Sequence, residues 1–327
     1  MADARRVACG VCGRYEPRVV GVPPVSERAK ALTPAWESMR VVQCRECGFY
    51  YTDPMPFWEA KDLQLLYADD YVPRYAEWWL RTRRHVDPQR RLSLIQSHMN
   101  MTGSPGTSAH APRFLDVGCG PGYALEAAID GGWEAHGLEP SESQASQTTR
   151  RLDSRANVHI ETIEDTRLPS AYFDAIYMDS VLEHLPDPSA AVRTLYRMLR
   201  GGGLAYILVP NEDRFAYVPA IILRRLNRRK ETPKLCPLAN PYHIVGFNRG
   251  TLIRLFQQNG FRVRHISVFR GVEPHKKTIG DHIPSIKGKL YRSIEEAAWS
   301  IGGLIGRGAQ IEAIFEKCGL GNQTIRA

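Results

Sequence analysis

Between residues 113 and 209, short apolar runs alternate with amphipathic stretches that are long enough to form helices. Strands are predicted at 113–117, 133–138, 158–162, 173–178 and 204–209, and helices at 123–130, 142–152 and 188–199. A strand, a helix and another strand in succession build a parallel β-α-β unit, and right-handed crossovers then place helices on both faces of the sheet. The pattern therefore predicts an α/β fold with a doubly wound sheet.

The segments on either side of this region have their own patterns. Upstream, helices are predicted at 59–68 and 74–99, the second containing Pro88, and a loop at 102–112. Downstream, the sequence predicts a helix at 249–258, a strand at 261–269, a polar loop at 271–290, a helix at 293–304 and a last strand at 309–316. We divide the chain into an N-terminal module without a sustained helical period (1–56), a helical connector and lid (57–112) and a main domain with a basic insert at 212–242 (113–327).

The charge balance restricts the partners of the chain. Among its 327 residues, 43 are Lys or Arg and 35 are Asp or Glu, which gives a formal net charge of +8. This excess favours acidic partners such as phosphorylated substrates, nucleic acid or anionic lipid. No apolar run reaches the roughly 18–20 residues of a membrane-spanning helix, and no apolar segment of a signal peptide follows Met1. We therefore expect a cytoplasmic protein.

Four of the seven cysteines form two C-x-x-C pairs, Cys9 with Cys12 and Cys44 with Cys47, and a glycine follows each pair. In a reducing compartment, two such pairs indicate a metal site rather than disulfides. Four thiolates complete the tetrahedral shell of Zn²⁺ and leave no position for water, as in structural zinc sites. A redox function is the alternative, but it would need one pair rather than two.

The segment Phe114-Leu-Asp-Val-Gly-Cys-Gly-Pro-Gly-Tyr123 leads from a predicted strand into a predicted helix. Its alternate glycines, Gly118, Gly120 and Gly122, allow a tight turn and the close approach of a ligand that a Cβ atom would block. Asp116 adds a carboxylate beside this turn. The spacing differs from the G-x-G-x-x-G pattern of dinucleotide sites. A ligand without a diphosphate is therefore favoured.

Glu139 ends the second predicted strand of this region, where a carboxylate can accept both hydroxyls of a ribose. One carboxylate near a sulfonium and amine, and another at a ribose, suit S-adenosylmethionine. At these residues the chain resembles class I S-adenosylmethionine-dependent methyltransferases. The motifs that carry the resemblance, in order, are Leu115–Gly122, Gly137–Pro140, Phe173–Pro188 and Leu199–Leu204.

The resemblance implies a Rossmann-like, seven-stranded sheet and an enzyme that transfers a methyl group from S-adenosylmethionine. It also implies where the cofactor binds. By matching position, the methionine and ribose would be lined by Asp116, Gly118, Gly120 and Gly122. The ribose hydroxyls would be held by Glu139, the methionine end bordered by Met178 and Asp179, and the adenine amine met by Asp165.

A narrower resemblance concerns the N-terminal module. Its four cysteines, the segment Cys47-Gly-Phe-Tyr-Tyr-Thr-Asp-Pro54, and Tyr67 and Tyr71 resemble bacterial methyltransferases of sugar-nucleotide and polysaccharide pathways, including deoxysugar C-methyltransferases. This resemblance implies a small or carrier-linked sugar as the acceptor. Tyr71 is a candidate lid residue over the cofactor, and packing between modules is the alternative.

Two histidines are candidates for the base that removes the proton of the acceptor. His184 follows the fourth predicted strand, where the methyl group would point, but it could also serve only in packing. His243 lies in the segment that returns after the fifth strand and is the preferred base. The deoxysugar C-methyltransferases carry a Glu-His pair in a similar place, whereas Tyr242 precedes the histidine here. A role in orienting the loop is the alternative for His243.

The basic insert contains Arg224, Arg225, Arg228 and Arg229 after an apolar stretch. These arginines could bind the diphosphate of a nucleotide-sugar, lie on an anionic membrane, or simply face solvent.

Because such an insert could bind a membrane, a lipid or quinone O-methyltransferase is a second functional hypothesis. A non-catalytic S-adenosylmethionine-binding protein is a third. RNA modification is disfavoured because the sequence shows no aromatic-basic platform and its basic residues are concentrated in one insert. The sequence leaves the oligomeric state open.

Overall fold

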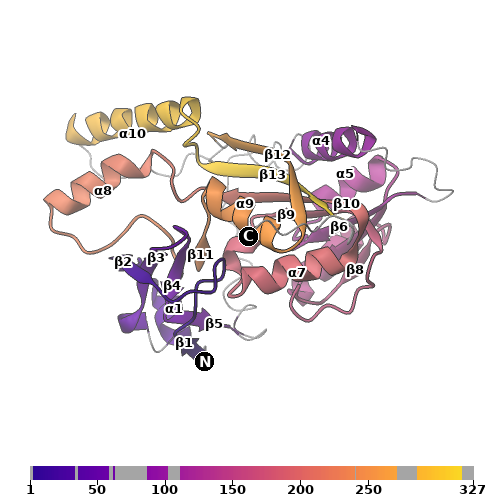
Figure 1. Ribbon diagram of the computed structural model, residues 1–327, viewed down its shortest axis with the longest axis horizontal. Coiled ribbons are helices and arrows are strands. Elements are labelled where there is room, and N and C mark those ends of the chain that lie inside the picture. Colours follow the sequence, from indigo (N-terminus) through magenta and orange to yellow (C-terminus); the bar gives the residue numbers. More distant parts are fainter. Residues whose placement is uncertain are drawn as a thin grey trace.

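The computed structural model describes residues 3–33, 36–58, 87–101, 111–239, 241–270 and 286–318, together with Asp62. Figure 1 shows a large sheet covered by helices and a small N-terminal sheet beside it. Two further helices, α8 (Tyr217–Leu226) and α10 (Ile286–Leu304), extend from one end of the large sheet, at the upper left of the view.

The large sheet contains seven strands in the order β12-β13-β10-β9-β6-β7-β8. Their bounds are β6 Arg113–Val117, β7 Glu134–Leu138, β8 Asn157–His159, β9 Phe173–Asp179, β10 Leu199–Pro210, β12 Phe261–Phe269 and β13 Gln310–Lys317. The neighbours from β10 to β8 pair in parallel, and β13 is antiparallel to both of its neighbours. The predicted doubly wound, mostly parallel sheet is confirmed.

Helices cover both faces of this sheet, as its connections require. Their bounds are α4 Asp87–Met101, α5 Tyr123–Asp130, α6 Glu142–Arg151, α7 Pro188–Met198 and α9 Arg249–Gln258. On one face, Leu195 of α7 and Phe256 of α9 are fully buried, and on the other, Ile95 of α4 and Leu125 of α5 are fully buried. The core therefore consists of two apolar layers with the sheet between them.

The local sequence explains why α7 forms where it does. The carboxylate of Asp187 caps the helix by accepting the backbone N–H of Ala190 at 2.9 Å, and Pro188 occupies the first turn, where its missing N–H is harmless. Val192 and Leu195 follow at helical spacing and are fully buried against the sheet. A cap, a proline and one apolar face thus fix both the start and the orientation of the helix.

The boundaries of several elements agree with prediction and others differ. The strands at 113–117 and 261–269 and the helices at 123–130 and 249–258 match the observed bounds. β10 begins at Leu199 rather than at 204, because the Gly201–Gly203 segment forms a bulge in its pairing with β9. α10 begins at Ile286, so the end of the predicted 271–290 loop is helical. The predictions at 59–68, 74–86, 102–110 and 271–285 lie outside the described residues, except for Asp62.

The N-terminal region forms two small sheets. β2 (Pro17–Gly21), β3 (Arg40–Cys44) and β4 (Tyr50–Asp53) pair as an antiparallel sheet, while β1 (Asp3–Arg5) pairs with β5 (Met55–Phe57). This region also contains a short α-helix, α1 (Glu27–Leu32), and a 3-10 turn at Trp36–Ser38, neither of which the sequence pattern reveals. A strand from far along the chain, β11 (Val245–Gly246), extends the first sheet by pairing with β4. The module is therefore built partly from residues that follow the insert.

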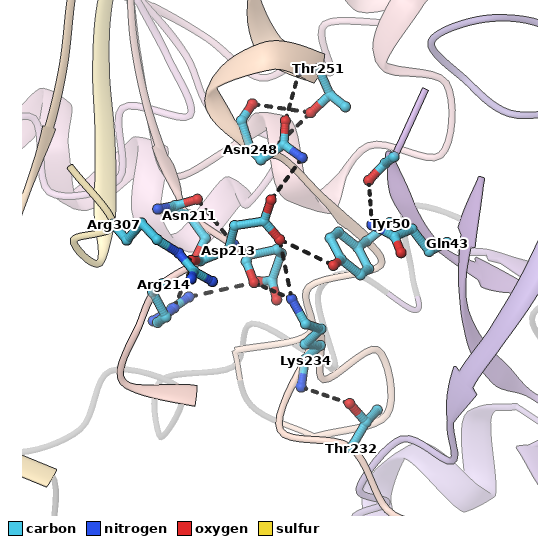
Figure 2. A network of polar contacts seen from close by, with 12 residues as sticks. Gln43, Tyr50, Asn211, Asp213, Arg214, Thr232, Lys234, Asn248, Thr251 and Arg307 are labelled. Carbon is cyan, nitrogen blue, oxygen red and sulfur yellow. Dashed lines mark hydrogen bonds and ion pairs between the residues drawn. The ribbon is translucent and has the colours of Figure 1, made fainter. Parts of the chain in front are cut away.

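A polar network holds the insert against this module (Figure 2). At its centre, Asp213 accepts hydrogen bonds from Tyr50 Oη at 3.1 Å and from Asn248 Nδ2 at 3.0 Å. Lys234 Nζ lies 3.5 Å from the same carboxylate and 4.0 Å from the centre of the Tyr50 ring. These contacts join β4, the start of α9 and two parts of the insert, its first residues at Asp213 and its later part at Lys234, so they hold these two parts of the insert together against the module.

Candidate active site and four-cysteine cluster

A cavity of about 730 Å³ opens where β6, β7, β8 and β9 end. The carboxyl edge of a doubly wound sheet is the usual place for a ligand in this architecture. The sequence-predicted site residues that line the cavity are Gly118, Gly120, Glu139, Asp165 and His184. These residues come from four separate loops, and the parallel order of the strands brings the loops together.

The predicted glycines shape the loop between β6 and α5. Gly118 and Gly122 have φ angles of 71° and 74°, in the left-handed region. A Cβ atom at Gly118 would lie 2.5 Å from Val181 Cγ2, and one at Gly122 would lie 2.5 Å from Thr148 Cγ2. A Cβ atom at Gly120 would instead meet open space. The first and last glycines therefore permit close packing of the chain, while Gly120 exposes backbone to the cavity.

Glu139 is held at the cavity wall by two backbone donors. Its Oε2 accepts the N–H of Gly120 at 2.9 Å and its Oε1 accepts the N–H of Ser141 at 2.9 Å. The side chain is mostly buried, and burial raises the pKa of its carboxyl group. Each carboxylate oxygen keeps a further lone pair for a hydrogen bond. The arrangement can accept two neighbouring hydroxyls, such as those of a ribose.

Four predicted cofactor residues, including Gly122, do not line the cavity. Asp116 is buried, and burial, reinforced by Asp179 and Glu139, raises its pKa well above the usual range. Met178 is fully buried. Asp179 accepts a 2.6 Å bond from Arg91 Nη1 of α4. Arg91, a buried residue that carries no recognisable sequence signal, thus ties the helix to the end of β9.

Two further predicted site residues are Asp165, expected at the adenine, and Tyr71, expected in a lid. Asp165 lines the cavity and accepts a bond from Thr162 Oγ1 at 3.2 Å. Tyr71 lies outside the described residues. Phe57 and Trp58, to which the sequence analysis assigned no role, also line the cavity. Because Phe57 ends β5 and Trp58 follows it, the N-terminal sheets contribute an aromatic wall to the site.

The two candidate histidines meet beside the cavity. The ring centres of His184 and His243 are 5.0 Å apart in an edge-to-face arrangement. Of the two histidines, only His184 lines the cavity. His184 Nδ1 lies 3.3 Å from the carbonyl oxygen of Tyr242, so this nitrogen is the donor. Burial lowers the pKa of His184 to about 4. His184 is therefore neutral at physiological pH.

Glu183 completes this cluster, and the sequence analysis gave it no role. Its carboxylate is 1% exposed, and its Oε1 lies 3.6 Å from His243 Nε2. Burial raises the pKa of Glu183 to about 8. The ligand atoms of Glu183, His184 and His243 lie within 4.8 Å of one another. A titratable carboxyl group and two imidazoles thus form one unit at the cavity wall.

The arginines of the insert are not part of the cavity lining. Arg224 and Arg225 lie in the last turn of α8, followed by Arg228 and Arg229. Arg225, Arg228 and Arg229 are exposed, and Arg224 is half-buried. The structure therefore brings them together at the end of the projecting helix rather than over the site.

The four predicted metal ligands converge near the N-terminus. The Sγ atoms of Cys9 and Cys47 are 3.5 Å apart, those of Cys12 and Cys44 are 3.6 Å apart, and all four lie within 4.8 Å of one another. A tetrahedral zinc ion with Zn–S distances of about 2.3 Å separates its sulfurs by about 3.8 Å. Hydrogen bonding from Cys9 lowers the pKa of Cys47 to about 5. The cluster has the composition and spacing of a four-thiolate zinc site.

Comparison with known proteins identifies the class. Residues 65–266, more than half of the chain, match the family described as Methyltransferase domain, and the chain belongs to this family. In solved structures, a similar fold occurs in phosphoethanolamine N-methyltransferase 2 of Haemonchus contortus in complex with S-adenosyl-L-methionine. The TM-score is 0.52 at 14% identity, over 83% of this chain and 63% of that one. Together, the fold and the family model place this chain among the proteins that carry a methyltransferase domain.

Two curated relatives have more similar sequences. A Mycolicibacterium smegmatis protein named "Probable S-adenosylmethionine-dependent methyltransferase" is 26% identical over 186 residues, which cover 57% of this chain and 66% of that protein. The ubiquinone biosynthesis O-methyltransferase of Pseudomonas fluorescens (strain Pf0-1) is 30% identical over 153 residues, which cover 44% of this chain and 62% of that protein. The chain thus spans just under two thirds of the length of each relative.

Proposed function

We propose that this methyltransferase transfers the methyl group of S-adenosylmethionine to a small or carrier-linked acceptor, with a sugar of a glycan or secondary-metabolite pathway as the substrate class. The observation that carries this proposal is one cavity with Glu139 on one wall and the Glu183–His184–His243 cluster beside another. When bound, S-adenosylmethionine supplies a methyl group that its sulfonium has already activated. Glu139 would hold the ribose.

Because the methyl group is already activated, the residues of the protein need only orient the acceptor and accept its proton. We assign His243 as the base, because its Nε2 lies 3.6 Å from Glu183 Oε1, and the Glu183 carboxylate stabilises an imidazolium once it ionises, which its raised pKa places near pH 8. His184, whose pKa is lowered to about 4, holds a proton poorly and is suited to orienting the acceptor by a hydrogen bond. The aromatic wall formed by Phe57 and Trp58 offers a surface on which a sugar ring can stack.

The zinc ion is assigned a structural role. Four cysteine ligands leave no open position for a substrate or a water molecule. The ion would fix Cys44, which begins the turn between β3 and β4, against the N-terminal Cys9. Because β4 pairs with β11, that turn is linked to the segment that carries His243. The metal thus supports the site without entering the reaction.

Steady-state kinetics with His243→Gln and His184→Gln test the assignment of the base. His243→Gln should lower kcat by about 100-fold or more, the usual contribution of a general base, while the affinity for S-adenosylmethionine stays within twofold. His184→Gln should mainly raise KM for the acceptor. Full activity of His243→Gln, together with an inactive His184→Gln enzyme, would assign the base to His184. Radiolabelled methyl transfer into fractionated cell extract supplies the acceptor for these assays.

A lipid or quinone O-methyltransferase is the second candidate function. It is favoured by the exposed aliphatic side chains on α8 and α10 and by the similarity to a ubiquinone biosynthesis O-methyltransferase. Label recovered in the lipid fraction would favour it over a soluble nucleotide-sugar. Label in RNA, or no label in any fraction despite cofactor binding, would argue for the RNA-modifying or the non-catalytic alternative.

A further inference from the structure

Exposed large aliphatic side chains are concentrated on the two projecting helices. Within the described residues, seven of the nine lie there, namely Ile222, Leu223 and Leu226 of α8, Ile294, Ile301 and Leu304 of α10, and the adjoining Ile305, while Val19 and Ile160 lie elsewhere. Leu226 is 76% exposed and Leu304 is 88% exposed. Exposed aliphatic residues that occur singly are ordinary, but a group of them on adjoining elements marks an interaction site.

The two helices lie side by side. α10 packs against α8 (Figure 1), and Gly302 of α10 lies close to the segment just before α8, since a Cβ atom there would lie 3.1 Å from Phe215 Cβ. On α8, Ile222 and Leu226 are one turn apart. On α10, Ile301 and Leu304 are three residues apart and share a face. Each helix thus contributes an apolar stripe to what we call the α8–α10 surface.

Positive charge borders this surface. Arg225, Arg228, Arg229 and Lys230 are exposed at the end of α8, and only Glu231 offsets them there. Arg307 is exposed just beyond α10. Like charges would repel a second copy that used the same surface, whereas anionic phosphates would be attracted.

The exposed apolar residues also limit which class of partner can bind this surface. They are aliphatic, so they offer no aromatic rings on which nucleic-acid bases could stack. Within the described part of the chain, no helix is long and apolar enough to cross a membrane. An apolar stripe with basic residues beside it is typical of helices that lie in the membrane interface.

We propose that the α8–α10 surface binds the surface of an anionic phospholipid membrane. This inference rests on the proposed methyl transfer to a carrier-linked acceptor, and it specifies that the carrier is anchored in lipid. β10 leads into α8, and α10 leads into β13, whose first residue, Gln310, pairs with Pro210 at the end of β10. The surface therefore lies at the same edge of the sheet as the cavity, where a membrane-anchored acceptor can reach it.

Co-sedimentation with two kinds of vesicle tests this inference. Vesicles of phosphatidylcholine with phosphatidylglycerol should bind the protein, and vesicles of phosphatidylcholine alone should bind it much more weakly. Leu226→Gln/Leu304→Gln should weaken binding by about 10-fold or more, since two apolar side chains no longer enter the interface. Arg225→Gln/Arg228→Gln/Arg229→Gln should weaken it by about 100-fold, at about fivefold for each charge near an anionic surface.

Val19→Gln/Ile160→Gln is the matched control, because both side chains are exposed and aliphatic but lie outside the α8–α10 surface. This variant should bind vesicles like the wild type. Equal loss in the control, no binding of the wild type, or wild-type binding by the Leu226→Gln/Leu304→Gln variant would overturn the inference. So would a wild-type dimer in light scattering that the leucine variant lacks, without vesicle binding, since a second copy would then be the partner.

Calorimetry with S-adenosylmethionine on the same preparations separates the two proposals. Normal cofactor affinity without vesicle binding refutes the membrane inference and leaves the proposed methyl transfer intact. Vesicle binding without cofactor affinity refutes the proposed function instead. The leucine variant should keep the cofactor affinity of the wild type, because neither leucine lines the cavity.

Discussion

Replacing the buried carboxyl group of Glu183 should change how the stability of the protein depends on pH. The folded state raises its pKa from 4.5 to about 8, mainly through burial. A tenfold change in an acid dissociation constant corresponds to about 1.4 kcal/mol. Keeping this group ionised in the folded protein therefore costs close to 5 kcal/mol in total, as an order of magnitude.

The sign of this pH dependence follows from the protonation of Glu183 in the folded and in the unfolded protein. As pH rises above 4.5, the unfolded chain releases the proton of Glu183 while the folded chain keeps it up to about 8. The free energy of unfolding that Glu183 contributes is thus complete below pH 4.5 and is lost as pH rises through 8. Between pH 5 and pH 8, the wild type should lose about 3 kcal/mol from this source. Glu183→Gln cannot ionise and should lose none of it.

Urea unfolding of the wild type and of Glu183→Gln across this pH range measures the difference. Glu296→Gln, a substitution of an exposed glutamate on α10, serves as the control. The difference in the free energy of unfolding between Glu183→Gln and the wild type should change by about 3 kcal/mol from pH 5 to pH 8, so that the variant becomes more stable relative to the wild type. Parallel stability curves for these two proteins would refute the reasoning, since Glu183 would then titrate alike in both states.

Two further predictions concern the ligands of the two sites. Metal analysis should find one zinc per chain in the wild type and in Cys318→Ser but none in Cys44→Ser/Cys47→Ser, and a disulfide among the four clustered cysteines would contradict the assignment. Calorimetry should show that Glu139→Ala binds S-adenosylmethionine and its demethylated product about 10-fold more weakly or worse, and to a similar degree, because a carboxylate at the ribose does not contact the methyl group. Glu142→Ala, a change at an exposed neighbour, should leave both affinities unchanged, and an unchanged Glu139→Ala enzyme would remove Glu139 from the site.

Local signals explain which parts of the fold the sequence predicts correctly. The segment from Arg113 to Asp130 combines a buried strand, three closely spaced glycines and a helix, and both predicted elements match the observed bounds. α9 is equally well marked, since Asn248 caps its start and Asn259 with Gly260 ends it. Such residues determine backbone geometry within a few positions, so their effect can be predicted without knowledge of the tertiary structure.

Other features depend on partners that are distant in the sequence. β11 is two residues long and exists because β4 pairs with it across nearly two hundred positions. The bulge that starts β10 early depends on its register with β9. Glu183 joins the histidine cluster because the backbone N–H of Ile244 donates to its carbonyl oxygen at 3.0 Å. None of these pairings leaves a periodic pattern in the sequence.

The insert is better understood as a fixed arm than as a solvated loop. At its C-terminal end, Lys234 is buried and its ammonium group contacts both Asp213 and the Tyr50 ring. At its other end, a short segment joins the end of β10 at Pro210 to α8, and α10 packs against that helix. An insert tied at both ends cannot move far without breaking buried polar contacts, each of which is costly to leave unpaired. These contacts tie the insert that carries α8 to the N-terminal module, whose Phe57 lines the cavity.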